Sequence, residues 1–217
     1  MKTAAKSGQP EDRQEVFVNL QEKKKSGSAV LWTRQVAAVL DEIEKTGVYR
    51  VKKEYIEAKN DTIADYYLKL YAWYTREARN YIALPTEVNY PVWLSVDESV
   101  MLQPVEDTVI FRLEVPEKEY ILCNFDAWGY VVNYWYVPTD DADAERHRAE
   151  IARYGLKSDD ELILTGKGNF YPLLKRKLLD SWKRVFTMTP ADDITGIVAT
   201  TWEIKKEWIR EVRRFDG

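Results

Sequence analysis

The sequence has almost none of the residues that build covalent cross-links or zinc sites, since it contains one cysteine and one histidine among 217 residues. A single cysteine cannot form an intramolecular disulfide. A structural zinc site needs about four Cys, His or acidic ligands, and one Cys and one His exclude it. We therefore predict no metal cofactor, and the scarcity of cysteine favours a reducing, cytoplasmic location.

Long apolar runs and a strong charge of one sign are also missing. No run of about 18 apolar residues occurs, and residues 1–13 contain no apolar core of a secretion signal. We therefore expect neither secretion nor membrane insertion. With 32 Lys and Arg residues against 36 Asp and Glu residues, the net charge is −4. A basic coat for nucleic acid is thus excluded for the whole protein, although cations can still cluster on one element.

The composition, 45% hydrophobic and 31% charged, is typical of a globular protein with one domain. Residues 1–28 are mostly Lys, Glu, Gln, Ser and Gly, which predicts a flexible N-terminal leader that is dispensable for folding. The one apolar stretch of this leader, residues 16–18, leaves the alternative that it is a strand of the sheet. Residues 29–217 form the predicted single domain.

Hydrophobic periodicity predicts both helices and strands in this domain. Strands are expected at 30–33, 90–96, 108–115, 120–125 and twice within 196–215, and helices at 36–45, 60–81, 126–137, 139–155 and 173–186. The short turn after 108–115 predicts a hairpin with 120–125, and Gly47 is expected to end the first helix in a left-handed C-cap. Because strict βαβ alternation is absent, we predict an α+β fold with a largely antiparallel sheet and packed amphipathic helices.

The same patterns predict which side chains are buried. On the 60–81 helix the apolar and aromatic residues fall on one arc: Ile63, Tyr66, Tyr67, Leu70, Tyr74 and Tyr81. We expect this arc to pack on the sheet and to bury Tyr66 and Leu70, with Trp135 buried nearby. The 139–155 helix is highly charged, which predicts a solvated flap with His147 on its surface.

The residue inventory limits the chemistry. An exposed histidine does not provide the positioned imidazole that Ser-His-Asp or Cys-His catalysis needs. Cys123 lies within an apolar strand and is predicted to be a small core residue rather than a nucleophile. Residues 165–169, Thr-Gly-Lys-Gly-Asn, lack the spacing of a phosphate-binding loop and predict a flexible turn.

Aromatic and basic residues give two candidate binding surfaces. The 8 Trp and 14 Tyr residues concentrate within 66–81, 90–93 and 128–136. Most are expected in the core, but a cleft lined by such side chains could stack a flat ligand. The basic face of the 173–186 helix, with the cations of 205–214, could contact nucleic-acid phosphates. A solvated face is the alternative, because acidic residues interrupt the patch.

Several aromatic motifs occur in a fixed order, at 31–35, 47–49, 124–128, 132–136, 181–186 and 201–204. Together they resemble a bacterial domain of unknown function, DUF3841, over about residues 30–215. The family name carries no activity, so this resemblance assigns a role to no residue.

A fainter resemblance is to ADP-ribosyltransferase folds. It rests on the strand that carries Thr33, Arg34 and Gln35, the helix after it, the Gly-x-Tyr that ends in Tyr49, and a late strand with Glu203. The resemblance implies that NAD binds, that Thr33, Arg34 and Gln35 hold its ribose and phosphates, and that Tyr49 stacks on the nicotinamide. It implies that Glu203 is the catalytic acid.

This sequence departs from one branch of those enzymes, because no histidine lies on the first strand. The alternative interpretation of Glu203 is a solvent-facing carboxylate on a strand. For the whole protein, the alternative to an NAD-dependent enzyme with a macromolecular acceptor is a non-catalytic binding module. Such a module would recognise a protein or nucleic acid through the aromatic cleft or the basic face.

Overall fold

The computed structural model describes residues 27–188 and 194–215. Six strands form one antiparallel sheet: β1 (Ser28–Val36), β3 (Val92–Ser95), β4 (Thr108–Pro116), β5 (Ile121–Asn124), β6 (Ile197–Thr201) and β8 (Ile209–Phe215). A separate two-stranded ladder consists of β2 (Val48–Tyr49) and β7 (Ile204–Lys205). The helices are α2 (Ala38–Thr46), α3 (Lys53–Asn60), α4 (Ala64–Ala78), α5 (Phe125–Val132), α6 (Asp141–Arg153), α7 (Glu161–Leu164), α8 (Lys167–Phe170), α9 (Pro172–Trp182) and α10 (Arg184–Thr187).

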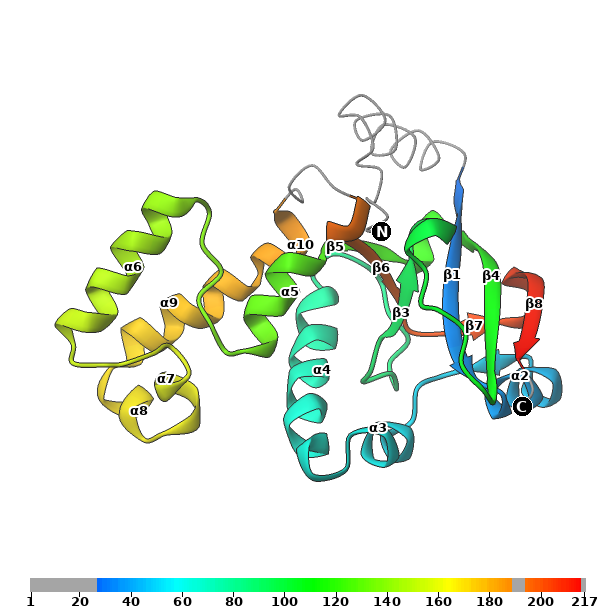
Figure 1. Cartoon of the computed structure of the whole chain (residues 1–217), viewed down its shortest axis with the longest axis horizontal. Helices are drawn as coiled ribbons and strands as arrows, with labels where there is room; N and C mark the ends of the chain where they lie inside the picture. The colour runs from blue at the N-terminus through cyan, green and yellow to red at the C-terminus, as the bar shows by residue number, and fades with distance from the viewer. Residues whose placement is uncertain (1–26, 189–193, 216–217) are drawn as a thin grey trace, which may run out of the picture.

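The strand order of the sheet is β5-β6-β3-β1-β4-β8. Figure 1 shows this sheet at one end of the molecule and a lobe of helices, α6 to α9, at the other, with α4 and α5 between them. The predicted α+β class, with an antiparallel sheet and packed helices, is therefore confirmed. In the described part of the chain, no helix has the length and apolar character needed to cross a membrane.

The predicted hairpin is wrong. β4 pairs with β1 and β8, whereas β5 pairs with β6 at the opposite edge of the sheet. A short 3-10 helix, Glu117–Glu119, lies between β4 and β5 and leads the chain away from β4. Strand partners therefore come from distant parts of the sequence, and long-range contacts decide the topology.

Alternate residues of the strands contribute to two separate cores, as a pleated sheet requires. Leu94 and Phe111 pack with Ile43 of α2 in one core, which we call the α2-side core. Trp93, on the other face, packs with helices α4 and α5 in a second core, which we call the aromatic core. α2 ends at Gly47 with φ 82° and a 2.8 Å bond from the Gly47 N–H to the Ile43 carbonyl, so the predicted C-cap is confirmed.

The aromatic core joins α4 to the sheet. The Tyr74 hydroxyl lies 3.0 Å from the Cys123 sulfur on β5 and 2.9 Å from the Thr200 hydroxyl on β6. The Tyr74 ring contacts Trp93 and Trp128 at centroid distances of 5.3 and 5.4 Å. Burial raises the pKa of the Cys123 thiol to about 12, so this residue is the inert core cysteine that the sequence predicts.

Burial on and near α4 only partly follows the predicted arc. Leu70 is buried as predicted, while Tyr66 is half-buried. Ile63 is exposed because the predicted continuous helix is interrupted by a 3-10 turn, Asp61–Ile63. Trp135 is 48% exposed, contrary to prediction, because α5 ends at Val132 before reaching it.

In the helical lobe, the backbone of α8 lies very close to that of α7. Residues 165–169, predicted to be a flexible turn, are mostly helical, with α8 beginning at Lys167. A Cβ atom at Gly168 would lie 2.1 Å from the Leu162 carbonyl oxygen and 2.9 Å from Cδ of Lys175. Only glycine therefore fits here without movement of the backbone.

We expect Gly168→Ala to lower the free energy of unfolding by about 1–3 kcal/mol, because the added methyl group overpacks this contact. The matched control is Gly166→Ala, where a Cβ atom would meet nothing within 4 Å. The control should change stability by less than about 0.5 kcal/mol. Urea denaturation followed by tryptophan fluorescence measures both, and equal effects would contradict the close approach.

Candidate functional site

The first predicted site residues lie near the end of β1. The Thr33 hydroxyl donates a 3.0 Å hydrogen bond to the Trp93 carbonyl on β3 and accepts a 2.8 Å bond from Nε2 of Gln35. Thr33 is buried and Gln35 is half-buried. Thr33 therefore fixes the position of the Gln35 amide, and Gln35 is the more accessible of the two.

Arg34 lies on the opposite face of β1, because successive side chains of a strand alternate. Its Nη1 donates to the carbonyl of Gln103, in the loop before β4. The structure therefore does not bring Arg34 together with Thr33 and Gln35. The period of two was already visible in the sequence and could have separated these side chains.

The pairing of β2 with β7 brings Tyr49 close to Glu203. The β2–β7 ladder places Tyr49 opposite Ile204, the residue after Glu203. Oε1 of Glu203 accepts a 2.7 Å bond from Nε of Arg50, the residue after Tyr49. In the sheet, β3 lies between β1, which carries Gln35, and β6, which ends two residues before Glu203.

Glu203 is a buried carboxylate with two cations beside it. The residue is 7% exposed, so the interpretation as a solvent-facing strand carboxylate is wrong. Nη2 of Arg50 lies 2.5 Å from Oε1, and Nζ of Lys205 lies 3.6 Å from Oε2. The Arg50 side chain is 45% exposed against 8% for Glu203. Arg50 is therefore the more solvent-exposed partner of a buried negative charge.

Tyr49 belongs to the α2-side core and is only 3% exposed. Burial raises the pKa of its hydroxyl well above the usual range, and the nearby Tyr55 and Glu42 add to this. The Tyr55 ring lies 6.2 Å from the Tyr49 ring and is half-buried. The present position of Tyr49 anchors β2, which ends directly before Arg50, and its ring does not face solvent.

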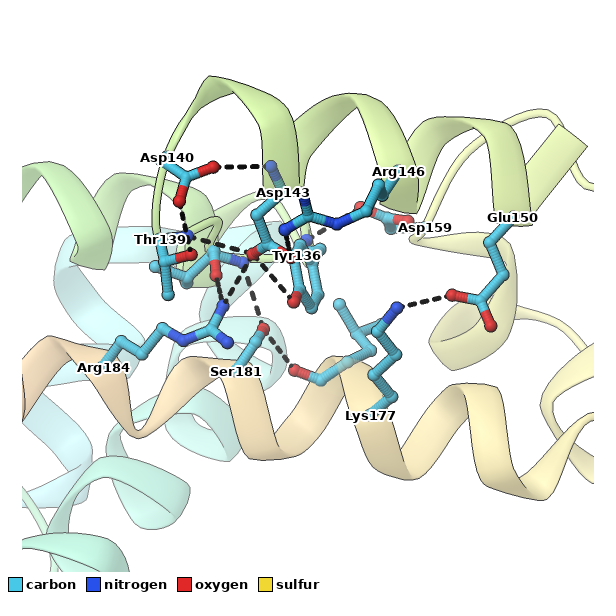
Figure 2. A network of polar contacts seen from close by, with 12 residues as sticks. Tyr136, Thr139, Asp140, Asp143, Arg146, Glu150, Asp159, Lys177, Ser181 and Arg184 are labelled. Carbon is cyan, nitrogen blue, oxygen red and sulfur yellow. Dashed lines mark hydrogen bonds and ion pairs between the residues drawn. The ribbon is translucent and has the colours of Figure 1, made fainter.

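A second polar cluster, in the helical lobe, was missed by the sequence analysis (Figure 2). His147 is 3% exposed, so its predicted surface position is wrong. Its Nε2 lies 2.7 Å from Oδ1 of Asp159, and its ring stacks on Tyr136 at a centroid distance of 3.9 Å. The signal that could have found this is Ile151, four residues later on the same face of the helix and also buried.

No Ser, Thr or Cys side chain in the described part of the chain is hydrogen-bonded to the His147–Asp159 pair. Oδ2 of Asp159 accepts a 2.8 Å bond from the Tyr136 backbone N–H. Nδ1 of His147 is buried and has no hydrogen-bond partner among the described residues. Without a hydroxyl or thiol on this nitrogen, the described residues form no Ser-His-Asp or Cys-His arrangement. The pair connects α6 to the loop before α7.

Asp143 connects the predicted solvated flap to α10 (Figure 2). Its Oδ2 accepts 3.0 Å bonds from the Thr139 N–H and the Tyr136 hydroxyl, and lies 3.5 Å from Nη1 of Arg184. Partial desolvation raises the pKa of the Asp143 carboxyl, but these donors and Arg146 outweigh it and leave the pKa below its ordinary value. α6 is therefore a packed part of the lobe.

We expect His147→Ala to lower the free energy of unfolding by about 1–3 kcal/mol, because it removes the partner of Asp159 Oδ1 and a stacked ring. The control is Arg148→Ala, since the Arg148 side chain is 74% exposed and should contribute less than about 0.5 kcal/mol. Urea denaturation of both variants measures the difference. A loss for Arg148→Ala as large as that for His147→Ala would contradict the buried pair.

Three of the cations on the basic face predicted for residues 173–186 form ion pairs. Lys177 lies 2.5 Å from Glu150, Lys183 lies 2.8 Å from Asp180, and Arg184 lies near Asp143. These pairs leave less free positive charge for nucleic-acid phosphates than the sequence pattern indicates.

The comparison with protein families agrees with the resemblance in the motifs. The model of the domain of unknown function DUF3841 matches residues 30–210, which include all five predicted site residues. No curated protein and no solved structure matches the chain. The arguments about function therefore rest on the geometry described above.

Proposed function

The chain belongs to the DUF3841 family, and we propose that it is an NAD-dependent ADP-ribosyltransferase-like enzyme that modifies a macromolecular acceptor in the cytoplasm. The observation that carries the proposal is the buried Glu203 carboxylate, which lies in the connection between β6 and β7 and is paired with the more exposed Arg50. A carboxylate in such a position can stabilise a positive charge that develops on a bound substrate.

The proposed reaction uses NAD as a substrate. The bond between nicotinamide and ribose breaks, and its electron pair leaves with the nicotinamide. Positive charge develops on the ribose, where Glu203 stabilises it. A nucleophile of the acceptor then forms the new bond to the ribose carbon and loses a proton. Because Glu203 is shielded from water, its charge acts more strongly on the ribose than it would in solution.

Two cations beside Glu203 support the proposal, because they can pair with the phosphates of NAD. Arg50 is the exposed partner of Glu203, and its planar guanidinium can pair with phosphate oxygens. Lys205, which lies 3.6 Å from Glu203, is a second cation within reach. In the proposal, Arg50 exchanges Glu203 for a phosphate when NAD binds, which frees the carboxylate for the ribose.

Some of the predicted residues would contact NAD, and others would hold those residues in place. Gln35 offers its amide to the ribose, and Thr33 holds that amide in place. Tyr49 anchors β2 directly before Arg50, and stacking on nicotinamide requires its ring to leave the α2-side core. Arg34, which lies on the other face of β1, has no contact role here.

A non-catalytic binding module is the second candidate function, and one observation favours it. Three large apolar side chains of the helical lobe are exposed: Leu164 by 62%, Phe170 by 81% and Leu173 by 80%. Exposed apolar groups beside charged ones are typical of surfaces that bind a protein or nucleic-acid partner.

Release of nicotinamide from NAD tests the enzyme function. Purified full-length protein, incubated with NAD and with a lysate that supplies acceptors, should release nicotinamide and label macromolecules with ADP-ribose. Labelling without the protein serves as the background. The absence of both release and labelling would favour the binding module.

A further inference from the structure

A groove lies beside the connection between β4 and β5, in which Glu119 forms an ion pair with Lys205 of the Glu203 site. Its volume is about 720 Å³, and its walls include Tyr81 and Ile82 after α4, Ile121 and Leu122 of β5, and Phe186 of α10. The Tyr81 ring stacks on Phe186 at 5.0 Å and is 44% exposed. The groove therefore exposes aromatic and aliphatic surface that a bound segment could cover.

β5 forms one wall of the groove and is an edge strand. Among the described strands it pairs only with β6, through Ile121 to Asn124. In an antiparallel pair, every second residue of an edge strand directs its N–H and C=O away from the partner. Such an edge is a template for another strand, and proteins usually cover it.

The described chain begins at the rim of this groove. Gly27 lines the groove, and its carbonyl accepts a 3.0 Å bond from the N–H of Glu117. Its φ of 82° is left-handed, so the backbone changes direction here rather than continuing the line of β1. The residues before Gly27 therefore start next to the groove.

We propose that residues 15–20 of the same chain bind along the open edge of β5 and place apolar side chains in the groove. Their sequence, Glu-Val-Phe-Val-Asn-Leu, has Val, Val and Leu at alternate positions and Phe between them, which is typical of a strand. Residues 21–26 form the connection, and six extended residues span about 20 Å.

This assignment gives the N-terminal segment a role that its composition as a whole does not indicate. Residues 1–26 lie outside the described residues. The experiment below also bears on the prediction that residues 1–28 are a dispensable leader. The occupant is the chain's own segment because it has the pattern of a strand and is attached at the groove's rim. A covalently attached strand also has a high effective concentration at the groove.

Amide hydrogen exchange of the full-length protein tests the proposal. In a variant with Val16, Phe17 and Val18 replaced by serine, the amides of β5 should exchange about 10-fold faster or more than in wild type. A second variant, Tyr81→Ser, removes a groove wall and should increase exchange in the same amides. The control, Ala4→Ser with Ala5→Ser, should leave it unchanged.

Two results would overturn the proposal. Equal exchange of the β5 amides in wild type and in the 16–18 variant would mean that residues 1–28 are the dispensable leader predicted from composition. Protection of β5 that increases with protein concentration would mean that a second copy supplies the strand. Neither result bears on NAD, so the failure of this proposal is distinct from that of the enzyme function.

Discussion

Leu70→Asp is expected to lower the free energy of unfolding by about 3–5 kcal/mol, because it places an unpaired charge in the core. Leu70 is 2% exposed and packs in the aromatic core with Trp73, Tyr74 and Trp128. That core joins α4 to β5 and β6, so a charge at this position disturbs the contact between helix and sheet. Chemical denaturation monitored by circular dichroism measures the loss.

The control for this prediction is the neighbouring Lys69→Asp. Lys69 is the preceding residue of the same helix and is exposed. Its substitution therefore introduces an aspartate into α4 without burying it. We expect a change below about 0.5 kcal/mol for this variant. A melting temperature for Leu70→Asp equal to that of the wild type would show that the buried face of α4 is wrongly assigned.

Glu203→Gln is expected to reduce turnover of NAD by about 100-fold or more while changing NAD affinity little. The amide keeps the size of the side chain but cannot stabilise positive charge on the ribose. The fold should survive, because Arg50 remains partly solvated when its partner is neutral. Initial rates of nicotinamide release at several NAD concentrations separate kcat from KM.

Glu207→Gln is the matched control for this substitution. Glu207 lies four residues later, in the 3-10 helix Lys206–Trp208, and is exposed. It should retain the kcat of the wild type. If Glu203→Gln also retained wild-type kcat, the carboxylate would have no part in the reaction and the proposed mechanism would be wrong.

Local features of the fold could be predicted from the sequence because neighbouring residues determine them. The apolar spacing from Val39 to Ile43 and the glycine at position 47 define α2 and its C-cap. The alternation from Val109 to Val115 in β4 separates the residues of the α2-side core from those on the other face. Both depend on periods of 3.6 and 2 that the sequence displays directly.

Strand pairing could not be predicted in the same way. The short segment between β4 and β5 indicates a hairpin, but β5 pairs with β6, which follows many residues later. The Tyr74 hydroxyl contacts both Cys123 and Thr200, and such contacts arise only after the elements assemble. Here the long-range pairing of β5 with β6 overrides the local turn signal.

The side-chain partners at the candidate site could not be predicted from the sequence either. The β2–β7 ladder places Tyr49 opposite Ile204, the residue after Glu203, but motif order does not reveal Arg50 as the partner of the carboxylate. The charged composition of α6 hides the burial of His147, because most of its neighbours in the sequence remain exposed. Side-chain partners across elements depend on tertiary packing and have no local signal.

The most direct test of the proposed function is an isothermal titration of the full-length wild-type protein with NAD. We predict saturable binding at one site, retained in Glu203→Gln and weakened in Arg50→Ala, because Arg50 would pair with the phosphates. Circular dichroism of each variant establishes that it is folded. The absence of saturable binding at millimolar NAD in the folded wild type would contradict the proposed NAD site.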